Sequence, residues 1–331
     1  MLTRCAFASG IAGLGAALCA AASYTEAAQA QAYPSRTVRL IVPFPAGGSA
    51  DLLGRALAKK LGEGLGQQVL VENRVGAGGT IGVTAVARSP ADGYTLGLGT
   101  VSTLGMAPVV RANPPYESLA AFAPISLVAS APFLLVVNAS VPAKSVGELV
   151  ELARSRPGQL NFASIGDGTL QHFSGEQLKS LTGASMVHVP YKGVAPALVD
   201  LLAGQVQIMF DVLASFQVQN LQSGRLRALA VLGPARVAQL ASVPTMAEAG
   251  LRGFEVTAWF GAIAPRGTSQ EIVARLNAEV RKAVASAEMR EAISVQGFEP
   301  SANSPEEFAE LIRGDLEKWA RVVKATGFKA E

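Results

Sequence analysis

Short β-branched runs alternate along the chain with stretches in which apolar residues recur at helical spacing. The run at 38–42 is typical of a buried strand, and leucines recur on one face of the segment that follows, 49–65. Further strands are expected at 69–72, 94–99, 133–138, 160–163, 186–189, 207–210 and 227–232, with a loop-rich stretch from 100 to 124. This alternation predicts an α/β fold whose parallel sheets are covered by helices on both faces.

Several helix starts carry a hydroxyl residue followed three positions later by glutamate, which predicts a capping box. These pairs are Ser145/Glu148, Thr245/Glu248, Thr268/Glu271 and Ser304/Glu307. Pro305 occupies the first helical position after Ser304, where its fixed φ is favourable. The helix after Thr268 places apolar residues on one stripe and is expected to pack against a core.

Two glycine-rich junctions lie where a predicted strand runs into a predicted helix. The first is Ala46-Gly47-Gly48-Ser49, and the second is the segment 161–169, which contains Gly166 and Gly168. The start of a helix has backbone N–H groups without intrahelical partners, and glycine allows a ligand to come close to them. Each junction therefore predicts an anion site, and two facing junctions would form a cleft for a small carboxylated molecule.

The first 32 residues have the pattern of a cleavable export signal. Arg4 supplies the basic start, an apolar small-residue stretch covers 7–22, and Ala30-Gln31-Ala32 fits a cleavage site. We expect an exported protein whose mature chain begins at Tyr33; an uncleaved N-terminal anchor is the weaker alternative. Both cysteines, Cys5 and Cys19, lie in this segment, so the mature chain would have no disulfide or thiolate chemistry.

Composition and motifs exclude several classes of function. With 16% charged residues, a net charge of +3 and no basic run, the chain is a poor candidate for binding nucleic acid. Gly166-Asp167-Gly168 lacks the third glycine of the dinucleotide fingerprint, and no phosphate-binding Gly-Lys-Ser/Thr motif is present. The only histidines, His172 and His188, come from separate segments without metal-ligand spacing, so we expect no metal site and no cofactor.

Catalytic chemistry has little support in the sequence. A nucleophile elbow of the Gly-x-Ser-x-Gly type is missing, and His172 fits a capped or partly buried histidine better than a base. An exported α/β enzyme that acts on a carboxylate stays open as an alternative, but no nucleophile, base and oxyanion site can be assembled from the residues.

Several motifs resemble one known family, in the expected order and over the chain from Tyr33 to the C-terminus. They include 42–51 (Val-Pro-Phe-Pro-Ala-Gly-Gly-Ser-Ala-Asp), 71–79, 188–193 (His-Val-Pro-Tyr-Lys-Gly), 195–206, 224–230 and 243–250. They resemble the substrate-binding proteins of tripartite tricarboxylate transporters, also called Bug-type or TctC-like receptors.

The resemblance implies a periplasmic receptor with the two-lobed type II binding-protein fold, closing on a carboxylate. Lobe 1 would comprise 33–130 and 256–331, and lobe 2 would comprise 131–255. The partners would be a small organic acid and the membrane components of a tripartite transporter, or a sensor protein, with the receptor itself a monomer.

The resemblance also assigns the site residues. Ligand carboxylate would meet backbone amides of Ala46, Gly47, Gly48 and Ser49 from lobe 1, and Ser164, Gly166, Gly168 and Thr169 from lobe 2. Asp211 would line the cleft and suit a hydroxyl or ammonium group, and Phe44 and Trp259 would form walls. Asp51 would either face the ligand or only complement the helix dipole, and Asn73 would hold the loop backbone.

One departure from the family pattern concerns the ligand. Ala107 stands where the family usually has asparagine before proline, and 116–124 lacks the usual acidic residue. If this loop reaches the distal end of the ligand, the pocket is more apolar than usual there. We therefore expect a monocarboxylate or aromatic acid rather than a tricarboxylate.

Overall fold

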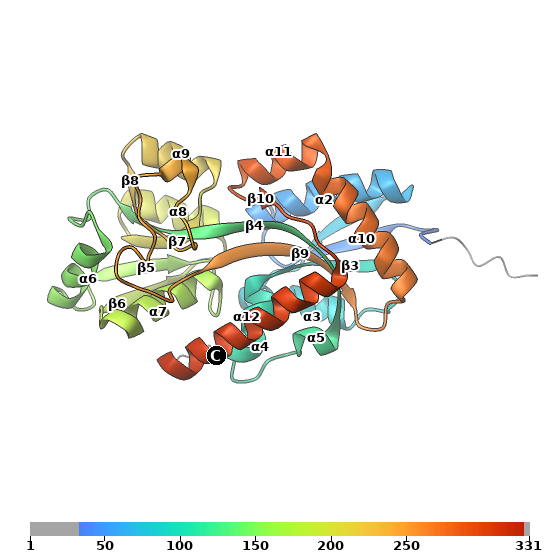
Figure 1. Ribbon diagram of the computed structural model, residues 1–331, viewed down its shortest axis with the longest axis horizontal. Coiled ribbons are helices and arrows are strands. Elements are labelled where there is room, and N and C mark those ends of the chain that lie inside the picture. The colour runs from blue at the N-terminus through green and yellow to red at the C-terminus, as the bar shows by residue number, and fades with distance from the viewer. Residues whose placement is uncertain (1–32, 328–331) are drawn as a thin grey trace, which may run out of the picture.

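The computed structural model describes residues 33–327 and shows two α/β lobes side by side, connected by two long strands (Figure 1). Residues 1–32, the expected export signal, lie outside the described part of the chain. Among the described residues, no helix combines the length and apolarity needed to cross a bilayer.

Lobe 1 is built on a sheet in the order β2-β1-β3-β9-β4. Its elements are β1 (Val38–Val42), α2 (Ser49–Leu65), β2 (Val69–Asn73), η1 (Ala77–Gly79), α3 (Thr80–Ala87), β3 (Thr95–Thr100), η2 (Val101–Met106), α4 (Ala107–Val110), α5 (Ser118–Ala121), α10 (Gln270–Ala285), α11 (Ala287–Val295), β10 (Glu299–Pro300) and α12 (Pro305–Thr326). Because β1 is parallel to both β2 and β3, the loops after these three strands meet at one edge of the sheet.

Lobe 2 has a second sheet in which β5 runs parallel to β6 and β7, with β7 and β8 on either side of β4. Its elements are α6 (Val146–Ser155), β5 (Leu160–Ser164), α7 (Leu170–Thr182), β6 (Met186–Pro190), α8 (Val194–Ala203), β7 (Ile208–Val212), α9 (Ser215–Gln222), β8 (Leu226–Val231) and the 3-10 turn η3 (Ala238–Leu240). The loops after β5, β6 and β7 therefore also meet at one edge.

Two strands pass between the lobes. β4 (Phe122–Asn138) and β9 (Thr257–Pro265) pair with each other up to Pro132 and Thr257, and from Phe133 onward β4 pairs with β7 and β8 of lobe 2. The sequence predicted only the second half of β4, because Pro124 and the small residues near it read as a loop. The first half is a strand because β9 covers it on one side, with register shifts between Pro124 and Ser126 and between Leu127 and Ala129.

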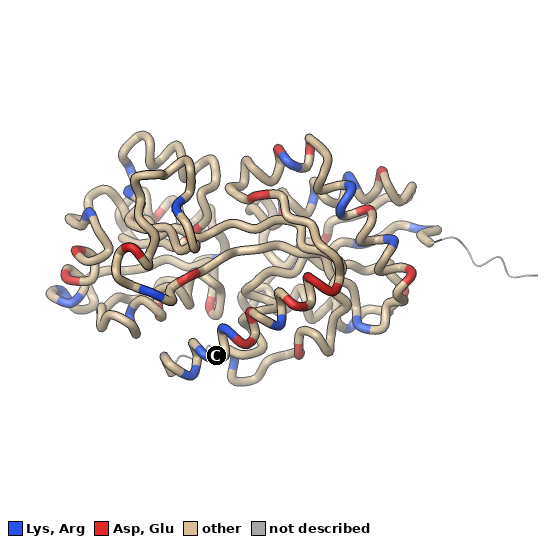
Figure 2. The backbone as a smooth tube through the Cα atoms, viewed as in Figure 1, with Lys and Arg blue, Asp and Glu red and all other residues tan. Residues whose placement is uncertain are grey.

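The C-terminal helices pack on lobe 1, and the last one also reaches lobe 2. α10 and α11 lie against α2, whereas α12 runs below β4 and β9 from one lobe toward the other (Figure 1). Phe308 of α12 packs so closely on Gly261 of β9 that an added Cβ would lie 2.1 Å from the ring. Further along α12, Trp319 packs edge-on against Phe173 of α7 at 4.9 Å between ring centroids. Charged residues lie mainly outside the two crossing strands, which are tan along most of their length in Figure 2.

The predicted helix caps are partly confirmed. Ser304 and Glu307 form the expected capping box with Pro305 in the first turn, and Ser145 accepts from the backbone of Glu148. Thr245 and Glu248 exchange both predicted bonds, but they close a turn rather than the predicted short helix. The cap of α10 is Ser269, so the predicted Thr268 pair was wrong by one residue; Thr268 donates instead to the carbonyl of Pro265.

Candidate functional site

The loop between β1 and α2 is held at the edge of lobe 1 by the side chain of Asp51. This carboxylate is buried and accepts from the backbone N–H of Gly47 (3.0 Å), from Arg55 Nε (3.0 Å) and from Asn73 Nδ2 (2.9 Å). Asn73 Nδ2 also donates to the carbonyl of Phe44 (3.0 Å), which confirms its predicted role in holding the loop. Burial alone would raise the pKa of Asp51, but the bonds from Arg55, Gly47 and Asn73 outweigh it and lower that pKa.

The N-terminus of α2 faces the space between the lobes. Its N-cap, Gly48, provides no side-chain cap, so the first-turn N–H groups are not satisfied by the cap residue. Gly47 adopts a φ of +82°, a backbone conformation that glycine permits at no steric cost. The hydroxyl of Ser49 donates to Gln296 Oε1 (3.0 Å) and ties this end of α2 to the segment after α11. The macrodipole and the unmatched amides favour an anion here.

A cavity of about 660 Å³ lies between the lobes at this point. Seven of the predicted site residues line it: Phe44, Ala46, Gly47, Gly48, Ser49, Asp211 and Trp259. The other five, Asp51, Ser164, Gly166, Gly168 and Thr169, are not among its lining residues; Ile165, Leu170 and Gln171 line it from the same segment of lobe 2. The volume is in the range of ordinary small-molecule sites.

The wall of the cavity is mostly aromatic and aliphatic. Phe133 contributes from the crossing strand β4 and Phe216 from α9 of lobe 2, and Phe260 and Phe298 contribute from the lobe 1 side. From the end of β3 and the start of η2, the lining comes from Thr100, Val101 and Ser102, whereas Ala107 is buried and not among the lining residues. The apolar character therefore comes from residues other than the substituted Ala107.

Asp211 is the acidic group of the cavity. It lies in β7, is 4% exposed, and accepts from the backbone of Val212 (2.9 Å) and from Gln217 Nε2 (3.3 Å). Burial raises the pKa of Asp211 to about 6, against the two hydrogen bonds, which lower it. The carboxyl group thus offers a ligand a hydrogen-bond acceptor, and a donor when protonated.

Lys192 is the basic group of the cavity, and the sequence analysis did not include it in the site. Its side chain is exposed, and it has no hydrogen bond or ion pair with any residue in the described range. The position was visible in the Tyr-Lys-Gly motif of 191–193, but only the parallel pairing of β5 with β6 brings that loop to the cleft. Gln171, Gln219 and Gln296 were likewise missed.

Trp259 connects the cavity wall to α12. Its indole Nε1 donates to Asp315 Oδ2 (2.7 Å), and its ring packs edge-on against Phe308 at 5.4 Å. Burial raises the pKa of Asp315, although the Trp259 bond and the nearby Lys318 oppose this. The wall residue is therefore fixed by the same helix that reaches lobe 2.

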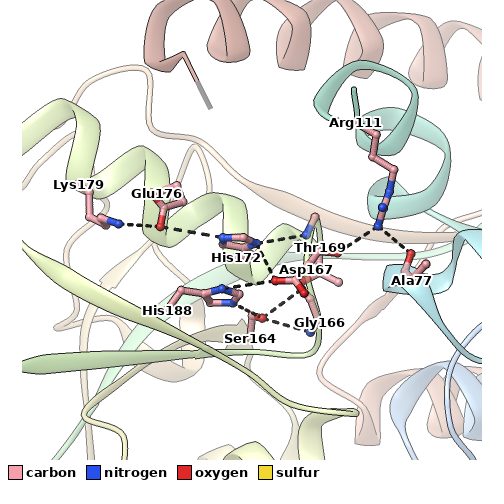
Figure 3. A network of polar contacts seen from close by, with 11 residues as sticks. Ala77, Arg111, Ser164, Gly166, Asp167, Thr169, His172, Glu176, Lys179 and His188 are labelled. Atoms are coloured by element: carbon pink, nitrogen blue, oxygen red, sulfur yellow. Dashed lines mark hydrogen bonds and ion pairs between the residues drawn. The ribbon is translucent and has the colours of Figure 1, made fainter. Parts of the chain in front are cut away.

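The second glycine loop forms a polar network on the side of β5 and α7 (Figure 3). The rings of His172 and His188 stack at 3.6 Å with an angle of 9°, and Asp167 Oδ1 lies 3.8 and 3.6 Å from their Nδ1 atoms. Ser164 Oγ lies 2.6 Å from His188 Nε2, accepts from the N–H of Gly166 and contacts the Gly166 carbonyl. Burial lowers the pKa of both histidines, that of His172 to about 3.

This loop also makes polar contacts with lobe 1 (Figure 3). Arg111 of lobe 1 donates to the carbonyl of Ala77 (2.9 Å) and to the carbonyl of Asp167 (3.3 Å) in lobe 2. The N–H of Leu170, in the first turn of α7, donates to Ser102 Oγ of lobe 1 (3.0 Å). This amide, next to the predicted site residue Thr169, is thus used to join the lobes.

The network does not have the geometry of a hydrolase or a metal centre. Ser164, His188 and Asp167 contact one another in the sequence serine, histidine, carboxylate, as the members of a catalytic triad do. However, Ser164 is fully buried outside the cavity, and the distance from His188 Nδ1 to Asp167 Oδ1 is too long for a hydrogen bond. Three possible metal-ligand atoms lie within 4.8 Å of one another. However, His172 Nδ1 already accepts from Gly168 N–H (3.2 Å), and parallel rings cannot both direct in-plane lone pairs at one ion.

Comparison with known proteins identifies the family. Residues 53–328 match the family model described as tripartite tricarboxylate transporter family receptor. Protein BugT of Bordetella pertussis is 40% identical over 301 residues, which cover 91% of this chain and 92% of BugT. The structure titled R. palustris Rpa4515 with adipate has a TM-score of 0.83 and 37% identity, covering 90% of this chain and 99% of that one. MatC from Rhodopseudomonas palustris with bound malate has a TM-score of 0.81 and 34% identity, with 88% and 100% covered.

Proposed function

Because the chain belongs to the tripartite tricarboxylate transporter receptors, a family of non-catalytic solute-binding proteins, we propose that it captures an organic acid with an apolar body. The observation that carries this proposal is the interlobe cavity, whose walls are aromatic and aliphatic and whose charged lining residues are Lys192 and Asp211. A tricarboxylate carries three negative charges, whereas Lys192 is the one cationic side chain among the residues that line this cavity.

The acid is expected to lie with its carboxylate at the start of α2 and its apolar part between the lobes. The carboxylate accepts from the first-turn amides after Gly48, with Lys192 as the counter-charge. Phe44 and Trp259 cover the apolar part, and Asp211 contacts a hydroxyl or amino substituent at the lobe 2 end. The relatives whose structures contain adipate and malate are consistent with a carboxylate ligand.

The receptor is expected to act as a periplasmic monomer that delivers its ligand to the membrane components of a tripartite transporter. Support for this location comes from the structural relatives, which include a periplasmic transporter protein and the periplasmic binding protein BugD. The lobe division proposed from the sequence, 33–130 with 256–331 and 131–255, falls within two residues of the switch in β4 pairing between Pro132 and Phe133.

The test is a thermal-shift and calorimetric screen of the purified protein against benzoate, adipate, malate and citrate. We expect saturable stabilisation by benzoate or adipate and a smaller shift with citrate, because a ligand that binds only the folded state raises the melting temperature. Preferred binding of citrate would contradict the apolar ligand class. Product formation, followed by NMR of the ligand during the incubation, would contradict the receptor function itself.

A further inference from the structure

The stacked histidines lie behind the second glycine loop, outside the cavity, and the proposed function does not use them. His172 comes from the first turn of α7 and His188 from β6, and the pair lies next to the loop between β5 and α7 (Figure 3). Both histidines belong to lobe 2, and Arg111, Ser102 and Gly78 of lobe 1 approach the loop from the other side.

One hydrogen bond fixes the protonation state of His172. The backbone N–H of Gly168 donates to His172 Nδ1 at 3.2 Å, so this nitrogen carries a lone pair and the neutral ring carries its proton on Nε2. Adding a proton would place an N–H on Nδ1, where it would face the N–H of Gly168. Donor would then oppose donor, and the loop could not keep its present shape.

The same loop makes two contacts with lobe 1, one residue before Gly168 and two residues after it. The carbonyl of Asp167 accepts from Arg111, and the N–H of Leu170 donates to Ser102 Oγ. A Cβ on Gly78 of lobe 1 would lie 2.6 Å from the carbonyl of Asp167, so the two loops touch through their backbones. A shift of the loop at Gly168 therefore disturbs the contact between the lobes.

We propose that His172 is a positioning residue of the ligand site, which keeps the β5–α7 loop in its lobe-bridging shape only while its ring is uncharged. The charged and titratable groups that face the pair are Asp167 from the loop, and Glu176 and Lys179 from α7. From β5, the neighbours are Ser164 and the ring of Phe162, which do not titrate in this range. His188 stacks on the ring, and two charged rings at 3.6 Å would repel each other.

Two substitutions of His172 separate its role as a hydrogen-bond acceptor from its ability to take up a proton. In His172→Asn, the amide oxygen can occupy the place of Nδ1, accept from Gly168 N–H and remain uncharged at acid pH. In His172→Leu, a side chain of comparable size offers no acceptor. His188 stays in place in both variants. The sequence has only two histidines, so the imidazole NMR spectrum of the untagged chain reports this pair alone.

The first measurement needs no ligand: amide hydrogen exchange of Gly168 and Leu170 in the full chain, compared between variants at the same pH. At about pH 5.5, we expect faster exchange of both amides in the wild-type chain than in H172N, and little difference between these two proteins near pH 7. H172L should exchange faster than both at either pH. Equal exchange in all three proteins at about pH 5.5 would overturn the proposal.

The second measurement rests on the proposed function for its probe, benzoate, or adipate if the screen favours it. For each protein, the dissociation constant at about pH 5.5 is divided by that at pH 7. The two ratios are then compared between wild type and H172N, because Asp211, His188 and the ligand are common to both measurements. The pKa of His172 is about 3 in the folded loop, whereas that of an unperturbed histidine is 6.5, so lowering the pH from about 7 to about 5.5 favours a displaced loop with a protonated ring. The wild-type ratio should therefore exceed that of H172N by up to about tenfold. Equal ratios would contradict the role in binding. If no acid binds, the proposed function fails, and the exchange experiment still decides the role of His172.

Discussion

Replacing Asp211 by asparagine tests whether the buried carboxyl group of the cavity lowers the free energy of unfolding. Its pKa rises from 3.8 to about 6 on folding because of burial, so the folded chain binds more protons than the unfolded chain between these values. The free energy of unfolding therefore falls as pH rises through this window, and the full cost is present above about pH 6. A shift of about two pKa units corresponds to about 3 kcal/mol.

The Asp211→Asn variant removes this cost while keeping the shape of the side chain. The oxygen facing Val212 can still accept its N–H. The new amide group would meet Gln217, whose Oε1 is buried and has no hydrogen-bond partner among residues 33–327. After a flip of the Gln217 amide, this oxygen could accept from the new N–H. We expect the variant to be more stable than the wild type near pH 7, by up to about 3 kcal/mol, and equally stable near pH 4.

The assay is urea unfolding, followed by tryptophan fluorescence, of both proteins at several pH values between about 4 and 7.5. His172 titrates in the opposite sense, since its lowered pKa reduces stability as pH falls, but it is present in both proteins and cancels in their difference. Asp92→Asn is a suitable control, because Asp92 is an exposed partner of Arg36. A stability difference that does not change with pH would refute the reasoning. So would an Asp211→Asn variant that is less stable at pH 7.

Three further substitutions test the site and the lobe contact. Lys192→Gln should weaken benzoate or adipate binding by about tenfold in calorimetry with little change in melting temperature, since the exposed side chain has no ion-pair partner within residues 33–327. Gly78→Ala should weaken binding while each lobe stays folded by circular dichroism, because its Cβ would meet the Asp167 carbonyl at 2.6 Å and its φ is +63°. Trp259→Phe should cost about 1–3 kcal/mol in urea unfolding, because the carboxyl group of half-buried Asp315 loses its indole donor. Unchanged binding in the first two variants, or unchanged stability in the third, would contradict these assignments.

Local sequence signals predicted the elements well where hydrophobic period and caps agreed. The bounds of β1 and α2 were predicted to the residue, and the start of α12 followed from its capping box. The first half of β4 could not be predicted, because a strand made of Phe122 to Pro132 is stabilised by pairing with β9, more than 120 residues away. Nothing local in the segment records that partner.

The site was likewise predictable where it depends on local residues and not where it depends on pairing between distant segments. The lobe 1 loop could be identified from its glycines, since backbone geometry there depends on local residues. The lobe 2 contribution depends on which loops the parallel pairing of β5, β6 and β7 brings together, and so Lys192 and Gln171 were missed. The stacking of His172 on His188 comes from the same pairing of distant segments.

The two glycine loops, alike in sequence, have different roles in the folded chain. At the start of α2, Asp51 from the helix itself holds Gly47, and the first-turn amides are left facing the cavity. At the start of α7, an amide of the first turn is taken by Ser102 of the other lobe, and the loop before it rests on His172. The amides of the first loop therefore remain available to an anion, whereas the second loop uses an amide in a contact with the other lobe. The second loop is thus better suited to joining the lobes than to binding the acid, and this joining role is the one that an uncharged His172 is proposed to support.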